Sequence, residues 1–570
     1  MIKPRKAVLK MQEYKPPTSG REDFLRLDFN ENTLGCSPKV MEALKKINSN
    51  SLATYPEYNE LRKKLAEYCN VNTDEILPTN ATDEAIKTVI ETYAEKGKDE
   101  VIIPTPTFAM FKFYAQLNEA VLKEVLYNDD LSFPTNKVLD SINKKTKIVI
   151  LVNPNNPTGT SIKDEDIIKI IEKAKKNYAL VFIDEAYWQF YGKTSIPLIK
   201  KYDNLIVTQT FSKAFGLAGL RLGYIISNKE NIKNMAKALS PYSVNNAAIS
   251  CGLAALNDLE YVNNYAKEVS ESKKIVYNEL EKLKIEYHPS EANFVLLNIG
   301  ENAALFCKRL KEKGILVRDR SRDPLLSGYV RITLGTKEQT KSLILAIESL
   351  MKEINPMLIF DIDGVLVDVS KSYRFAIKKT VEYFTGKEIS LQDVQALKNM
   401  GGYNNDWDAS EALIKLKGKN IGKQEIIGKF QDIYAELMDN EPWLLDKQLL
   451  ESLSKRYKMA VFTGRIREEA EYVLKKNNAS KYFDKIIAME DVMKRKPNPE
   501  GILKLMNGSK KAYYFGDMID DMRAAASANV IGIGVLPPQD KSKEMEELLI
   551  ANGAKAVLDD INKITEVLEN

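Results

Sequence analysis

Short apolar runs bounded by turn residues recur along the first half of the chain, and they indicate buried strands. These runs lie at residues 100–103, 147–152, 179–183 and 205–207. Apolar residues at helical spacing predict amphipathic helices, at 57–69, 163–177, 229–239 and 244–284. Strands that alternate with helices predict a large α/β domain, which we place at about residues 45–280.

A second pattern follows this domain. Alternating strands are expected near 293–298, 315–318 and 329–333, with a helix near 337–353. They predict a small lobe made of about residues 281–355 and the N-terminal arm, in which residues 24–36 pass from an alternating run into a turn. The N-terminal unit is therefore expected to span residues 1–355.

A new unit is expected after Pro356, which breaks the preceding helix. Met357 begins an apolar strand directly, and we interpret it as a former initiator, so that two ancestral chains are joined almost without a linker. Further strands at 458–462 and 512–516 predict a second α/β domain at 357–570. Helices expected over about 370–450 form an inserted cap.

Composition narrows the class of protein. A chain of 570 residues suggests three or more folding units at about 100–200 residues each. Because 83 Lys and Arg stand against 79 Asp and Glu, charge favours neither a nucleic-acid partner nor a membrane. The four cysteines form no C-x-x-C pair, which argues against a disulfide framework and a zinc site. With neither a signal-peptide core nor a membrane-spanning apolar run, we expect a cytoplasmic protein.

The chain contains a single histidine, His288. One histidine cannot supply a His-rich metal site, and its neighbours are typical of a turn before a strand, so a structural role is favoured. Acid–base chemistry is therefore expected to depend on Lys, Asp, Glu or Tyr.

Lys213 lies on a glycine-bearing loop just after the strand at 205–207, with Thr210 and Ser212 before it and Arg221 after it. This set suits a phosphorylated aldehyde, because the amine can form a Schiff base while hydroxyl and guanidinium donors hold the phosphate. A Ser-Lys pair alone would more often be an ordinary exposed loop.

Two other segments carry groups for such a ligand. Residues 80–85 open a helix whose free N–H groups attract phosphate, although alone they are only a capped helix. Asp184 ends a buried apolar strand, where a carboxylate is costly unless it is paired. A protonated pyridine nitrogen would be such a partner, since the carboxylate raises the pKa of that nitrogen.

The string around Lys213, the arm around Asn30 and the string at 153–159 resemble fold-type-I aminotransferases, in particular histidinol-phosphate aminotransferases, over residues 24–350. The resemblance implies pyridoxal 5'-phosphate on Lys213, which moves the proton in the reaction. The other implied cofactor-binding residues are Tyr55, Ala81, Thr82, Phe108, Asn156, Asp184, Tyr187, Thr210, Ser212 and Arg221. Asn30, Arg318 and Arg331 are the implied substrate-binding residues.

Five of these positions depend on the resemblance for their interpretation. Ala81 stands where the family usually has glycine. Without the resemblance, Phe108 could equally be a core residue, and the strand arginines Arg318 and Arg331 would be read as solvated. In the family, the tyrosine that matches Tyr55 reaches the cofactor phosphate of a partner subunit, which implies a homodimer.

In the second unit an apolar strand ends in Asp361-Ile-Asp363-Gly, and two carboxylates placed together repel unless they share a cation. A calcium-like turn would need further oxygen ligands. Thr463, Lys496, Asp517 and Asp521 follow in order, and the set resembles the haloacid-dehalogenase phosphatase superfamily over 357–560. The expected fold is therefore a fold-type-I aminotransferase followed by a Rossmann-like haloacid-dehalogenase domain.

This second resemblance implies a role for each motif. Asp361 attacks phosphorus, Asp363 protonates the leaving alcohol and then activates water, and Thr463 and Lys496 hold the phosphoryl oxygens. The implied Mg²⁺ ligands are Asp361, Asp363 through its carbonyl, Asp517 and Asp521, with Asp520 as a bystander. The cap turn 401–407 either reads the leaving group or is structural.

We expect a bifunctional enzyme. It would convert imidazole-acetol phosphate and glutamate to L-histidinol phosphate and 2-oxoglutarate, and then hydrolyse histidinol phosphate to histidinol. The alternatives are a phosphoserine route, an aromatic aminotransferase or a phosphothreonine decarboxylase, each with a phosphatase. A different class is also open, in which the C-terminal half binds phosphate as a regulatory module without turnover.

Overall fold

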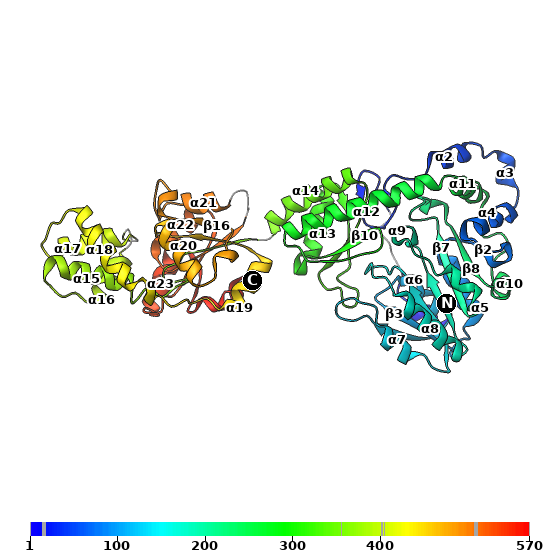
Figure 1. Cartoon of the computed structure of the whole chain (residues 1–570), viewed down its shortest axis with the longest axis horizontal. Coiled ribbons are helices and arrows are strands. Elements are labelled where there is room, and N and C mark those ends of the chain that lie inside the picture. The colour runs from blue at the N-terminus through cyan, green and yellow to red at the C-terminus, as the bar shows by residue number, and fades with distance from the viewer. Residues whose placement is uncertain are drawn as a thin grey trace. The chain divides into compact units, whose positions relative to one another are not determined.

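The computed structural model describes residues 2–13, 19–354, 356–400, 403, 405–506 and 511–568 (Figure 1). The chain divides into two compact units, Met1–Leu350 and Met351–Asn570. The division falls within the last turns of helix α14 (Lys337–Ile354), slightly before the break that we expected at Pro356.

The first unit is built around a seven-stranded sheet. Its strands, in spatial order, are β2 (Ile76–Asn80), β8 (Leu222–Ser227), β7 (Leu205–Thr210), β6 (Leu180–Asp184), β5 (Thr146–Val152), β3 (Glu100–Thr105) and β4 (Val121–Leu126). All neighbours are parallel except β8, which is antiparallel to β2 and β7. The four strands expected from apolar runs are confirmed, whereas β2, β4 and β8 were not anticipated.

Helices cover both faces of this sheet, because successive strand residues point to opposite sides. Along β5, Ile148 packs into one core with helix α5 (Ala81–Tyr93), and Val149 packs into another with helix α8 (Asp164–Lys176). Both faces are buried, which explains why these strands are continuous apolar runs.

The amphipathic stretch expected at 244–284 is two helices, α11 (Asn246–Leu256) and α12 (Leu259–Lys282). The break falls at Asn257 and Asp258, residue types that favour helix ends. Asp258 accepts a hydrogen bond from Ser37, and the Asn257 carbonyl accepts one from Lys39 Nζ at 3.1 Å. These contacts join the break to the start of helix α2 (Pro38–Lys45). The helix expected at 229–239 is α10 (Lys229–Ala238).

The small lobe contains an antiparallel sheet. Its strands, in order, are β12 (Arg318–Asp319), β13 (Tyr329–Thr333), β10 (Phe294–Asn298) and β9 (Tyr287–His288). The N-terminal arm joins the lobe through β1 (Leu25–Arg26), which pairs with β11 (Ile315–Leu316). His288 Nε2 lies 3.2 Å from Thr160 Oγ1, a contact that suits the structural role expected for it.

The second unit has a six-stranded parallel sheet. Its strands, in order, are β16 (Lys485–Ile487), β15 (Lys458–Phe462), β14 (Met357–Phe360), β17 (Ala512–Gly516), β18 (Ile531–Val535) and β19 (Ala554–Leu558). This is the doubly wound order, in which the first strand lies at the centre and ligands bind beyond its carboxyl end.

The expected cap is a group of helices beside this sheet (Figure 1). It comprises α15 (Tyr373–Thr385), α16 (Leu391–Asn399), α17 (Asp406–Leu416) and α18 (Lys423–Leu437). In the predicted cap turn, residues 401, 402 and 404 lie outside the described residues.

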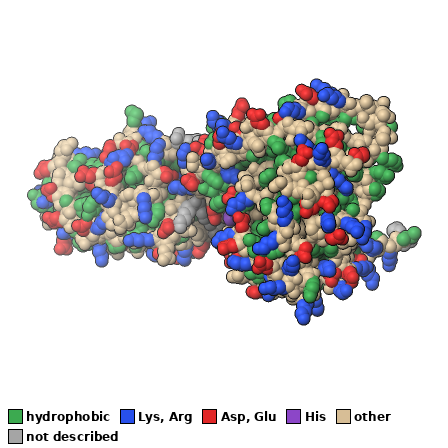
Figure 2. All heavy atoms as spheres, turned by 45° about the vertical axis from the view of Figure 1, so that its right-hand side comes forward, with side chains coloured by type: hydrophobic (Ala, Val, Ile, Leu, Met, Phe, Trp, Pro, Cys, Tyr) green, Lys and Arg blue, Asp and Glu red, His purple; other side chains and the backbone are tan. Residues whose placement is uncertain are grey.

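The surface mixes charges of both signs. On the face shown in Figure 2, Lys and Arg side chains are interspersed with Asp and Glu over both units. Of the helices that the structure describes, none combines the length and the apolar character needed to span a bilayer.

Candidate active sites

The first site lies where parallel strands β5, β6 and β7 end, because carboxyl ends of parallel strands meet at one sheet edge. A cavity of about 170 Å³ opens there. Nine of the predicted cofactor residues line it, namely Thr82, Phe108, Asn156, Asp184, Tyr187, Thr210, Ser212, Lys213 and Arg221. Ala81 directly precedes Thr82, so ten of the eleven predicted residues gather at this point.

The exception is Tyr55, which lies outside the cavity on the surface. Its side chain is 74% exposed and stacks on Tyr242, with ring centroids 4.2 Å apart. Two stacked aromatic rings left in water on a single chain are the arrangement that a partner surface would cover.

Lys213 presents a buried amine to the cavity. Its Nζ donates a hydrogen bond to the Phe29 carbonyl at 2.9 Å. Burial, with smaller contributions from the positive charges of Arg331 and Arg221, lowers the pKa of Lys213 to about 8, although Glu31 and Asp83 act in the opposite direction. About one amine in ten is then neutral at pH 7, which makes Lys213 a far better nucleophile than a surface lysine.

Asp184 ends strand β6 and lines the same cavity. Burial raises the pKa of Asp184 to about 7, while hydrogen bonds from the Ala186 N–H and from Thr208 Oγ1 at 3.4 Å oppose that rise. No described Lys or Arg forms an ion pair with this carboxyl, and a protonated ring nitrogen bound in the cavity would supply the missing cation. The residues present fit pyridoxal phosphate.

Beside Arg221, a residue predicted to bind the cofactor phosphate, the cavity contains a carboxylate that sequence reasoning missed. Arg221 Nη2 lies 2.7 Å from Asp83 Oδ2, in the first turn of α5. Nearby, Thr210 Oγ1 donates to Ser212 Oγ at 3.0 Å. The sequence did not single out Asp83 as a site residue, because acidic residues are common in the first turn of a helix. A bound phosphate would have to compete with it for Arg221.

Ala81 adopts a backbone conformation that favours glycine, with φ of 62°. Gly223 on β8 lies directly against this turn, since a Cβ there would come within 2.8 Å of the Ala81 carbonyl carbon. The family's usual glycine at position 81 thus has a physical reason, and alanine is accommodated at a cost.

Ala81→Gly is accordingly expected to raise the free energy of unfolding of the first unit by about 1 kcal/mol, because glycine adopts positive φ without steric strain. Urea unfolding followed by circular dichroism, fitted with separate transitions for the two units, measures the change. Ala85→Gly, in the interior of α5, is the matched control and should lower stability by about 1 kcal/mol. Equal destabilisation by both variants would contradict the strain at Ala81.

The three predicted substrate residues surround the cavity without lining it. Asn30 Nδ2 donates to the Tyr187 hydroxyl at 3.0 Å. Arg331 Nη1 donates to Asn156 Oδ1 at 2.5 Å, and Arg318 is its cross-strand neighbour on β12. Sequence reasoning missed Phe29 and Glu31, which line the cavity from the same arm as Asn30.

The second site lies where strands β14, β15 and β17 end, so that Asp361, Thr463 and Asp517 meet at one sheet edge. Lys496 Nζ lies 2.9 Å from Asp361 Oδ2 and 2.8 Å from Asp521 Oδ1. The carboxylates of Asp361, Asp517 and Asp521 are buried, and one oxygen of each lies within 4.8 Å of the others.

These acids repel one another. Burial raises the pKa of Asp361 to about 7 although Lys496 acts in the opposite direction. Burial, followed by the charges of Asp521 and Asp361, raises the pKa of Asp517 well above its usual value. Three buried oxygen donors with one lysine as counter-charge suit a hard divalent cation such as Mg²⁺.

Asp517 and Asp521 have different surroundings. Asp521 accepts hydrogen bonds from the Tyr514 hydroxyl at 2.8 Å and the Met518 N–H at 3.0 Å, and it holds Lys496. Asp517 instead packs against Gly364, where a Cβ would come within 2.1 Å of Asp517 Oδ2. Asp521 therefore helps to hold Lys496 in place. Asp520, expected to be a bystander, is also buried in the first turn of α22 (Ile519–Ser527).

Asp363 is held by an arginine to which we had assigned no role. Arg465 donates from Nε at 2.8 Å and from Nη2 at 2.5 Å to Asp363 Oδ1. The same guanidinium contacts Glu441 Oε2 at 2.9 Å and the Tyr434 hydroxyl at 3.1 Å. Thr463 Oγ1 accepts from the Arg465 N–H at 3.2 Å. Arg465 therefore connects the predicted acid to the cap.

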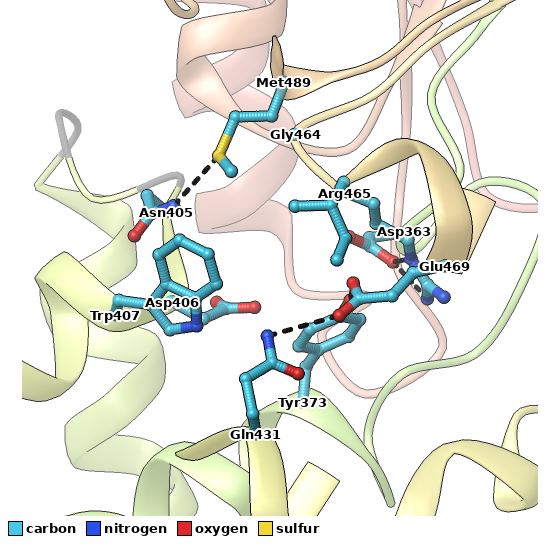
Figure 3. A pocket seen from close by; sticks show the side chains of 11 residues that line it. Asp363, Tyr373, Asn405, Asp406, Trp407, Gln431, Gly464, Arg465, Glu469 and Met489 are labelled. Atoms are coloured by element: carbon cyan, nitrogen blue, oxygen red, sulfur yellow. Dashed lines mark hydrogen bonds and ion pairs between the residues drawn. The ribbon is translucent and has the colours of Figure 1, made fainter. Parts of the chain in front are cut away.

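The motif residues line two adjoining cavities. The larger, about 200 Å³, is lined by Thr463 and Lys496, the predicted phosphoryl-binding pair. The smaller, about 30 Å³, is lined by Asp363 and Arg465 and by Asn405, Asp406 and Trp407 from the predicted cap turn (Figure 3). Part of that turn thus lies beside the predicted proton donor.

Comparisons with known proteins agree with both halves of this description. The aminotransferase class I and II family matches residues 22–347, and the haloacid dehalogenase-like hydrolase family matches residues 358–535. The histidinol-phosphate aminotransferase of Caldanaerobacter subterraneus is 40% identical over 333 residues, covering 57% of this chain and 93% of that protein. That of Methanocaldococcus jannaschii is 36% identical over 370 residues, covering 61% and 98%.

Solved structures show the same similarity for the first unit. A putative histidinol-phosphate aminotransferase from Erwinia carotovora atroseptica matches with a TM-score of 0.54 and 29% identity over 58% of this chain and 96% of that chain. The L-threonine-O-3-phosphate decarboxylase of Porphyromonas gingivalis matches with a TM-score of 0.50 and 26% identity over 58% and 100%. The chain therefore belongs to the aminotransferase class I and II family, and a haloacid dehalogenase-like hydrolase domain follows its aminotransferase domain.

Proposed function

We propose that the first unit interconverts imidazole-acetol phosphate and glutamate with L-histidinol phosphate and 2-oxoglutarate. The observation that carries this proposal is that the buried amine of Lys213, with its lowered pKa, and the buried carboxyl of Asp184 line one cavity. The names of the relatives with 40% and 36% identity support the choice of substrate.

Each residue of the first site then has a proposed role. Pyridoxal phosphate would supply an electron-withdrawing ring, and the residues that would hold this ring are Asp184 for its nitrogen, Asn156 and Tyr187 for its hydroxyl and Phe108 for its face. Thr82, Thr210, Ser212 and Arg221 would hold its phosphate. Lys213 Nζ removes the proton from the amino-bearing carbon of the substrate and returns a proton later in the reaction. Arg331 and Arg318 bind the anionic end of either substrate.

The proposed active form of the first unit is a homodimer. Its support is a set of large apolar side chains left exposed around α2 and α3 (Ser49–Ala53), together with Tyr55 and Tyr242. Leu34 is 53% exposed and Leu52 is 70% exposed. Covering such a patch favours association.

The second unit would hydrolyse histidinol phosphate to histidinol. Asp361 attacks phosphorus, the P–O bond to the alcohol breaks, and Asp363 gives its proton to the leaving oxygen. Asp363 then takes a proton from water, which cleaves the aspartyl phosphate and frees Asp361. Thr463 and Lys496 bind the phosphoryl oxygens. Asp361, Asp517 and the Asp363 carbonyl would hold Mg²⁺, and the ion would neutralise phosphoryl charge. Asp521 would be the fourth acidic residue of this metal site.

A comparison of substrates tests the proposal. Purified protein with magnesium should release phosphate from L-histidinol phosphate much faster than from phosphoserine, and should transfer nitrogen from glutamate to imidazole-acetol phosphate. Faster release from phosphoserine would favour a phosphoserine route. Carbon dioxide formed from phosphothreonine would instead assign the first unit to the chemistry of its decarboxylase neighbour.

A further inference from the structure

We propose that the phosphatase unit selects phosphate esters of alcohols that carry a positive charge, and that Glu469 is the residue that recognises this charge. The inference rests on the proposed phosphomonoester hydrolysis and adds the chemical class of the leaving group. It is carried by the small cavity between the sheet edge and the cap (Figure 3).

The position of the small cavity indicates which part of a phosphate ester would enter it. Asp363 lines it, whereas Thr463 and Lys496 line the larger cavity. Asn405, Gly464 and Met489 line both, so the two spaces adjoin. A phosphate ester with its phosphoryl group at Lys496 and its leaving oxygen at Asp363 must therefore extend its alcohol part into the small cavity.

The small cavity is acidic. Its lining residues include the carboxylates of Asp363, Asp406 and Glu469 and one cation, Arg465. Arg465 is shared between Asp363 and Glu441, and Lys398 pairs with Asp406. Asp363, Glu441 and Asp406 thus share Arg465 and Lys398 in direct ion pairs, and the charge of the buried Arg374 also acts on Asp363 and Asp406. With Glu469 added, carboxylates still outnumber cations, which leaves negative charge for a ligand to compensate.

Glu469 differs from Asp363 and Asp406, each of which has a direct ion pair. Its side chain comes from α20 (Arg467–Lys476), is 9% exposed, and has no ion-pair partner among the described residues. Burial raises the pKa of Glu469, whereas the hydrogen bonds that it accepts from the Tyr373 hydroxyl and from Gln431 Nε2 at 3.3 Å, together with the charge of Arg465, favour its charged form. Figure 3 shows its carboxylate directed into the cavity opposite that of Asp406.

The remaining walls also suit a cation. Trp407 borders the same space in Figure 3, and an indole ring attracts ammonium or imidazolium groups. A volume of about 30 Å³ accepts a group the size of an ammonium. A negatively charged leaving group would meet Glu469 and Asp406 at close range and be rejected.

The test compares esters of similar size and different charge. Wild-type protein with magnesium is given O-phosphoethanolamine, propyl phosphate and 3-phosphoglycerate, and kcat/KM is measured for each by phosphate release. We expect the cationic ester to exceed propyl phosphate by about 10–100-fold, the effect of one charge-assisted contact. Glu469→Gln should reduce that ratio by about 10-fold or more and improve 3-phosphoglycerate relative to propyl phosphate.

Matched variants separate recognition of charge from general damage. Glu471→Gln makes the same chemical change on α20 at an exposed residue paired with Arg467, and it should keep the wild-type ratios. Glu469→Asp, which retains the charge, should keep part of the preference. An unchanged ratio in Glu469→Gln, or equal rates for all three esters in wild type, overturns the inference alone. Failure to release phosphate from any ester, p-nitrophenyl phosphate included, overturns the proposed hydrolysis and the inference with it.

Discussion

Lys213→Ala is expected to reduce transamination by about 10³-fold or more, because the variant loses both the nucleophilic amine and the group that moves the substrate proton. Lys213 is buried and its pKa is lowered to about 8. No other described lysine lines the cavity, so none can replace it. Formation of 2-oxoglutarate from glutamate in the presence of imidazole-acetol phosphate measures the loss.

Two controls accompany this variant. Phosphate release by the same protein should be unaffected, since Lys213 belongs to the other unit. Lys273 is a second lysine whose pKa is lowered to about 8 by burial, and it donates to the Ser290 carbonyl at 2.6 Å without lining the cavity. Lys273→Met should keep the rate per folded protein. Transamination that survives in Lys213→Ala would remove the proposed role.

Asp361→Asn is expected to reduce phosphate release by about 10³-fold or more, because an amide cannot form the covalent phosphoryl intermediate. The change also removes one charge of the buried pair with Lys496. Phosphate release from histidinol phosphate at saturating magnesium measures the effect. Transamination in the same protein should be retained.

Asp368→Asn supplies the matched control, since Asp368 follows the motif in sequence but accepts a local hydrogen bond from the Ser370 N–H. It should keep phosphatase activity near the wild-type level. If wild type binds phosphate esters without releasing phosphate and Asp361→Asn changes nothing, the second unit is a binding module and the proposed hydrolysis is wrong.

The sequence predicted the place of a site residue wherever that residue lies at or just after the end of a strand. Lys213, Asp184 and Asp361 each follow a short apolar run, so that strand prediction alone places them at a sheet edge. Parallel strand order then brings such residues together, which explains why most of the predicted cofactor residues share one cavity.

Pairings between distant segments were not predictable. Arg465 and Asp363 are 102 positions apart, and Arg221 and Asp83 are 138 apart. No local periodicity reports such a contact, because it depends on how strands and cap helices pack. Glu469 was missed for the same reason, since an acid in the first turn of a helix is expected on helix-dipole grounds alone.

The contacts of Arg465 have a consequence for turnover. Ser372 and Glu441 lie where the chain enters and leaves the cap, and Ser372 Oγ donates to Glu441 Oε1 at 2.6 Å. Arg465 joins this pair and Tyr434 of α18 to the Asp363 carboxylate. Swinging the cap aside breaks at least one charge-assisted bond worth about 1.5–3 kcal/mol. In the proposed hydrolysis, we therefore expect departure of the alcohol to be coupled to Asp363, with cap opening rather than bond cleavage limiting the cycle.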